Sequence, residues 1–187
     1  MEVKQGSVIA LAIFMVSAVS VAVAYSDKPK SDKQLIKSAM SAAPKAVSKH
    51  AAVYMPDAKG AMRMLRAGTN GWTCIPANPN TPGEDPMCLD PNALEWMLAY
   101  MHHQTPPDKV GFGYMLKGGW DTSNVDPYAA PPTKKGDWIR TGPHIMIFGP
   151  AVKHMSGYET GAHPDTELPY IMWHGTPYEH LMIPVED

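Results

Sequence analysis

The sequence predicts an α+β domain in which a small, mostly antiparallel sheet packs on one main helix. Several short apolar segments resemble strands, and one longer segment has the apolar spacing of a helix. The chain of 187 residues also contains 19 prolines and 15 glycines, a content that favours long loops over a helix bundle. Once a predicted leader is set aside, about 160 residues remain, which is enough for one hydrophobic core.

The main helix is expected from Asp90 to about His103. Aspartate is a favourable N-cap, and Pro91 is well suited to the first helical turn. Apolar residues then recur with helical spacing over residues 93–101, and Pro106-Pro107 lies just beyond the expected end.

The strands are expected in short apolar segments on both sides of this helix. Residues 51–54 and 62–66 flank the turn residues 56–60 and predict a β-hairpin, with a helix over residues 58–66 as the alternative. A long polar loop is expected over residues 118–136 and a helical turn over residues 151–158. Further strands are expected at Trp72–Cys74, Val110–Leu116, Pro143–Phe148, Tyr170–Trp173 and His180–Pro184.

The two cysteines, Cys74 and Cys88, predict one disulfide bond. The segment between them is rich in Pro, Asn and acidic residues, so it has little to bury and benefits from a covalent link. Closing a loop of about 15 residues stabilises a fold by about 3 kcal/mol in the chain-entropy description. A pair of metal-bound thiolates is the alternative.

The start of the chain has the pattern of a signal peptide covering residues 1–24. Lys4 precedes an apolar run from Val8 to Ala24, which ends in the small-residue pattern Ala22-Val23-Ala24. This pattern predicts a periplasmic or secreted protein with no membrane span after removal of the signal. An uncleaved membrane anchor is the alternative, although the run is slightly shorter than the roughly 20 residues that span a bilayer.

The rest of the chain is expected to form an arm and one domain. Residues 25–48 predict a flexible or partly helical arm, in which Pro44 divides any helix into short pieces. Residues 49–187 are expected to form the single α+β domain.

Charge and motifs exclude several classes of function. The formal net charge is −2 and no basic stripe is present, so nucleic acid is not an expected partner. The chain lacks the G-x-S-x-G, P-loop, H-E-x-x-H and dinucleotide-binding patterns. The sequence therefore favours a binding protein over an enzyme of a common type.

Histidine and methionine recur two residues apart, which predicts a copper site. The pairs are Met101/His103, His144/Met146, Met172/His174 and His180/Met182, and the last three lie in expected strands, where such neighbours share a face. Thioether and imidazole groups are suitable ligands for Cu(I). Burial in the core is the alternative for these side chains. The predicted ligands are His144, Met146, Met172, His174, His180 and Met182.

Other residues offer different chemistry. His174 or His180 together with Glu179 predicts an acid–base pair of a hydrolase-like enzyme. A structural or interaction module without a small-molecule site is a further alternative.

The long polar loop carries two further candidates. Its residues Asp121, Asn124 and Asp126 have oxygen ligands suitable for Ca²⁺. Trp120 and Trp138 flank the loop and are the best candidates for exposed aromatic contact with a small ligand.

Two segments, residues 66–74 (RAGTNGWTC) and 175–184 (GTPYEHLMIP), resemble stretches of a group of exported bacterial proteins without a known activity. The resemblance covers most of the chain after the leader. It implies a bacterial origin and export from the cytoplasm, but no cofactor or site residue.

Overall fold

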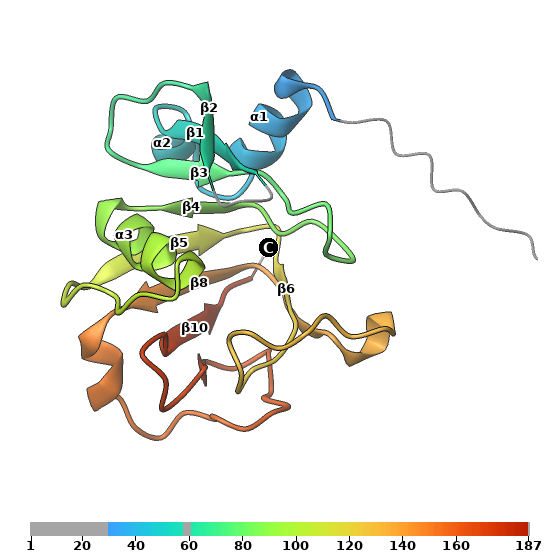
Figure 1. The fold of residues 1–187 in the computed structure, drawn as a ribbon, viewed down its shortest axis with the longest axis vertical. Coiled ribbons are helices and arrows are strands. Elements are labelled where there is room, and N and C mark those ends of the chain that lie inside the picture. The colour runs from blue at the N-terminus through green and yellow to red at the C-terminus, as the bar shows by residue number, and fades with distance from the viewer. Residues whose placement is uncertain (1–29, 58–60, 187) are drawn as a thin grey trace, which may run out of the picture.

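The computed structural model describes residues 30–57 and 61–186, and a mixed eight-stranded sheet forms its centre (Figure 1). The strand order is β2-β1-β3-β4-β5-β8-β10-β9, and a second sheet consists of β6 and β7. The strands of the large sheet are β1 (Ala52–Pro56), β2 (Met62–Arg66), β3 (Thr73–Ile75), β4 (Met87–Leu89), β5 (Gly111–Met115), β8 (His144–Phe148), β9 (Tyr170–Met172) and β10 (His180–Pro184). The predicted signal segment lies outside the described residues.

The α+β class is confirmed, but the sheet is larger than predicted. All neighbouring strands pair antiparallel except β1 and β3, which are parallel. This parallel pair joins the predicted β1–β2 hairpin to the rest of the sheet, and the three-residue strand β4 adds a further member. The expected long polar loop also contributes: β6 (Gly119–Asp121) pairs with β7 (Ile139–Thr141) to form a separate ribbon.

Helix α3 (Pro91–Met101) forms where the sequence predicts the main helix. The Asp90 side chain accepts a hydrogen bond from the Ala93 amide at 2.7 Å, as expected of an N-cap. The helix packs on β4 and β5 with Ala93 and Trp96 buried. Gly111 permits this approach, because a Cβ atom at that position would lie 2.3 Å from the Ala93 nitrogen.

A second helix covers the opposite face of the sheet, so the expectation of one main helix is incomplete. Helix α1 (Asp32–Met40) begins with a capping box between Ser31 and Gln34. Pro44 is the N-cap of the short helix α2 (Lys45–Ser48), so it divides the helical segment as predicted. Residues 30–48 take the partly helical form of the predicted arm, and they pack on the sheet, with Ala39 fully buried.

Strand β4 separates two hydrophobic clusters. Successive side chains of a strand point to opposite faces. Cys88 packs with Ala39 of α1, whereas Leu89 packs with Ala93 and Trp96 of α3. We call the face that carries Leu89 the inner face of the sheet. In Figure 1, α3 lies toward one end of the central strands and β6 toward the other.

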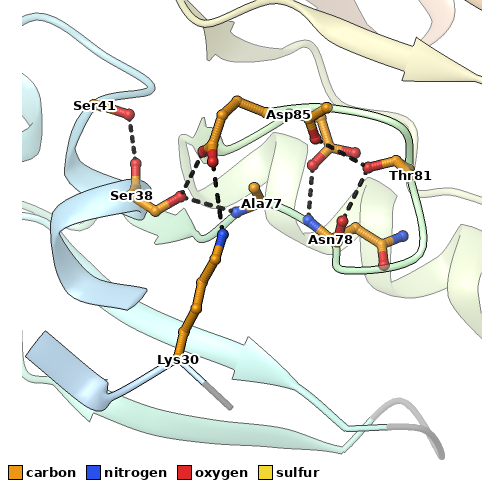
Figure 2. Close-up of polar contacts among 9 residues, drawn as sticks. Lys30, Ser38, Ser41, Ala77, Asn78, Thr81 and Asp85 are labelled. Carbon is orange, nitrogen blue, oxygen red and sulfur yellow. Dashed lines mark hydrogen bonds and ion pairs between the residues drawn. The ribbon is translucent and has the colours of Figure 1, made fainter. Parts of the chain in front are cut away.

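The predicted disulfide between Cys74 and Cys88 is confirmed, and it links residues that face each other on β3 and β4. Figure 2 shows that the enclosed loop is also held by α1. The Ser38 hydroxyl accepts a hydrogen bond from the Ala77 amide at 3.2 Å and donates one to Glu84, also at 3.2 Å. Lys30 lies 3.6 Å from the Glu84 carboxylate.

The remaining expected elements have close counterparts in the structure. Strands β5, β8, β9 and β10 lie within the predicted segments, and the expected helical turn is the 3₁₀-helix η2 (Pro150–His154). Within residues 30–57 and 61–186, no helix has the length and hydrophobicity needed to cross a bilayer.

The disulfide gives the first testable prediction. Replacing both cysteines (Cys74→Ser with Cys88→Ser) is expected to lower the free energy of unfolding by about 3 kcal/mol, because the covalent loop no longer restricts the unfolded chain. Urea unfolding followed by tryptophan fluorescence measures the change. The control Ser38→Ala keeps the disulfide and is expected to lose about 1 kcal/mol from its hydrogen bonds. A double variant as stable as the oxidised wild type contradicts the prediction.

Candidate functional site

Five of the six predicted metal ligands lie on the inner face of the sheet. His144 and Met146 are on β8, His180 and Met182 are on β10, and Met172 is on β9. All five are buried, and the three methionines belong to the core cluster that also contains Trp96. The two-residue spacing in the sequence therefore identifies side chains that share one face of the sheet.

The strand register brings some of these side chains together and keeps others apart. Met146 lies directly opposite Met182, and Met172 lies directly opposite His180. His144, however, pairs with Pro184, four residues along β10 from His180. This offset corresponds to roughly 13 Å along the strand direction, so the two imidazoles do not share one ion.

His180 is a packed core residue. The centroid of its ring lies 5.2 Å from those of Trp96 and Phe148 and 5.0 Å from that of Trp173. Its Nδ1 atom lies 3.0 Å from the Tyr178 carbonyl oxygen, which fixes the proton on Nδ1. Burial lowers the pKa of His180 to about 4, so the imidazole is neutral at physiological pH.

His174 lies apart from the other five residues, in the turn after β9. Its Nδ1 atom is 3.0 Å from Oε2 of Glu179, and the same oxygen accepts a hydrogen bond from the Gly175 amide at 3.1 Å. The Glu179 side chain is 7% exposed, whereas that of His174 is 57% exposed. The six predicted ligands therefore do not form one centre. The predicted pairing of His174 with Glu179 is present.

The oxygen and sulfur ligands of Asp, Glu and Cys do not form a metal site among the described residues either. In the described part of the chain, no group of three or more His, Cys, Asp or Glu side chains is arranged to hold a metal. The expected calcium set is dispersed: Asn124 is buried and donates a hydrogen bond to the Gly161 carbonyl at 2.7 Å. Asp126 instead accepts a hydrogen bond from the Tyr128 amide at 2.9 Å.

A groove of about 360 Å³ lies beside the β6–β7 ribbon. We call it the Trp120 groove. Three segments line it together with Lys135: residues 82–84 of the disulfide loop, 116–120 and 140–143. Gly83 packs closely on the indole, since a Cβ atom there would lie 2.5 Å from Nε1 of Trp120. The aromatic ring is therefore held in place by the disulfide loop.

Positive charge surrounds the indole of Trp120. The Lys135 ammonium lies 5.1 Å from the ring centroid and the Arg140 guanidinium 5.6 Å from it, both within range of a cation–π interaction. Lys117 also lines the groove. The acidic residue in the lining, Glu84, is engaged by Lys30 at 3.6 Å.

These cations have no anionic partner among the residues that the structure describes. Within residues 30–57 and 61–186, none of Lys117, Lys135 and Arg140 forms an ion pair. All three side chains belong to exposed residues. The groove therefore combines an aromatic platform with three unneutralised cations, an arrangement suited to a small anion that carries a ring.

Only part of this site could be predicted from the sequence. Trp120 was expected to be exposed for ligand contact, and it does line the groove. The three cations were missed because they are far apart in the sequence and form no motif. Pairing of Trp120 with Arg140 across β6 and β7 brings two of the segments together.

Comparison with known proteins adds no relative: no family model, curated protein or solved structure matches this chain.

The burial of His180 gives a prediction on pH dependence. Its pKa is about 4 in the folded protein and about 6.5 when exposed, so the unfolded state binds protons more readily between these values. Stability is therefore expected to fall as the pH drops below about 6.5, with His180 contributing about 2 kcal/mol of this loss by pH 5.

The variant His180→Phe, which suits the aromatic surroundings, is expected to remove the His180 share of this dependence, while the share of buried His144, whose pKa burial also lowers to about 4, remains. Urea unfolding at pH 5, 6, 7 and 8 measures it, and exposed His163 provides the control variant His163→Gln. The prediction would be refuted if the free energy of unfolding of His180→Phe changed with pH as steeply as that of the wild type.

Proposed function

We propose that this protein is an exported small-ligand-binding protein, and that its Trp120 groove takes a small anion attached to an aromatic or sugar ring. The observation that carries the proposal is the position of Lys135 and Arg140 beside Trp120 with no acidic partner. A carboxylate, sulfate or phosphate neutralises the cations while its ring stacks on the indole.

The dimensions and construction of the groove support this proposal. Its volume of about 360 Å³ suits a small molecule rather than a polymer. Two of its walls belong to the β6–β7 ribbon and to the disulfide loop, which is tied to α1 through Ser38. A fixed site reduces the ordering cost of binding.

The compartment forms part of the proposal. A disulfide is compatible with an oxidising environment outside the cytoplasm. The leader pattern of residues 1–24 further favours a periplasmic or secreted bacterial protein.

Binding of model anions tests the proposed function. Isothermal titration calorimetry with phenyl phosphate, phenyl sulfate and benzoate is expected to detect binding of at least one, whereas neutral phenol binds more weakly. Arg140→Gln is expected to weaken binding about tenfold, since it removes a charged hydrogen-bond donor. Raising the salt concentration is expected to weaken it further, because the cations are exposed.

Matched variants distinguish binding in the Trp120 groove from nonspecific attraction of anions to the positive charge of the protein. Trp120→Ala removes the aromatic platform and is expected to reduce affinity at least as much as Arg140→Gln. Lys153→Gln removes a cation that lines a different cavity, so affinity is expected to stay the same. The proposal fails if none of the three anions binds, or if Trp120→Ala and Arg140→Gln bind as the wild type does.

One observation favours a second candidate function, acid–base catalysis by His174. The buried Glu179 carboxylate orients the imidazole through Nδ1 and leaves Nε2 toward solvent, as in a general base. The preceding residue, Trp173, has a positive φ of 57°, and such backbone strain is common beside functional groups. Glu179 also lines a cavity of about 230 Å³ with Asp108 and Lys153.

Hydrolysis of 4-nitrophenyl acetate tests this second function. If His174 acts as a general base, His174→Ala is expected to reduce the rate about 100-fold. Glu179→Gln is expected to reduce the rate as well, because the imidazole loses the carboxylate that orients it. His163→Ala, another exposed histidine, serves as the control. Equal rates in the wild type and His174→Ala would rule out this function.

A further inference from the structure

A buried nitrogen atom without a partner marks a second site, separate from the Trp120 groove. The His144 imidazole is fully buried, and its Nδ1 atom lies 2.7 Å from the Gly142 carbonyl oxygen. A carbonyl accepts and does not donate, so Nδ1 carries the proton and Nε2 presents a lone pair. Nε2 is buried and has no hydrogen-bond partner among the described residues.

The thioether of Met115 lies on the same face of the sheet as this imidazole. Met115 lies directly opposite His144 across β5 and β8. Both side chains reach the underside of Gly119: a Cβ atom there would lie 3.2 Å from Cε1 of His144 and 3.7 Å from Sδ of Met115. The imidazole edge and the sulfur therefore approach the same point beneath the β6 strand.

Nε2 of His144 and Sδ of Met115 cannot form a hydrogen bond with each other, because both atoms present lone pairs and neither carries a proton. An imidazole nitrogen and a thioether sulfur together are suited to a soft monovalent cation. A hard cation such as Mg²⁺ or Ca²⁺ requires oxygen ligands instead.

We propose that Nε2 of His144 and Sδ of Met115 bind one Cu(I) ion. This set differs from the six ligands predicted from the sequence, because Met115 belongs to it and His174 and His180 do not. Gly119 and Gly142, which contact His144, also line the Trp120 groove. Two residues without side chains thus separate the groove from the His144 imidazole.

Competition with a chromophoric Cu(I) chelator under anaerobic conditions tests the proposal on the purified protein. The wild type is expected to take one equivalent of Cu(I) from bicinchoninic acid. Met115→Leu, which conserves the side-chain volume, is expected to weaken binding at least tenfold. The matched control is Met172→Leu, another buried methionine of the inner face, which is expected to bind as the wild type. Loss of binding in both variants, or in neither, overturns the assignment, as does a wild type that takes up no Cu(I).

A measurement on the wild type keeps the test decisive if Met115→Leu does not fold. Addition of Ag(I), a redox-inert analogue of Cu(I), is expected to shift the NMR signals of the Met115 methyl group and the His144 ring. The signals of Met172 and His180 are expected to stay in place. Shifts confined to other methionines, or no shifts at all, refute the site.

Discussion

The alternation of side chains along β4 is the constraint on which the rest of the structure depends. Because Cys88 and Leu89 point to opposite faces, one three-residue strand joins the α1 cluster to the α3 cluster. The disulfide holds β4 beside β3 at the same position. Without this strand, the β1–β3 portion of the sheet has no hydrogen-bonded link to β5, β8 and β10.

The same alternation determines where function can lie. The inner face is filled by aromatic rings at the α3 end, where His180 is enclosed by Trp96, Phe148 and Trp173. At the other end, the cover is the thin β6–β7 ribbon, whose Gly119 brings backbone instead of a side chain close to His144. Two of the three candidate sites occur at this end: the Trp120 groove and the His144–Met115 pair, which both border Gly119.

Local sequence signals predicted elements that are stable on local grounds. The N-cap at Asp90, the division of the helical segment at Pro44 and the apolar strands β5, β8, β9 and β10 all agree with the structure. Strands β4, β6 and β7 were not predicted: each has only three residues, and they border segments rich in Pro, Gly and polar residues. Packing of the segment 32–43 was not predicted because, apart from Leu35, its buried residues are alanines, whose apolar signal is weak.

The sequence by itself determined the disulfide, the main helix, and the side chains that share the inner face, because these follow from residue type and from spacing along one strand. Only the tertiary structure decided which of those side chains meet. Strand register separated His144 from His180 and placed Met115 opposite His144. It also brought the cations of distant segments around Trp120, since contacts between strands depend on pairing rather than on distance along the chain.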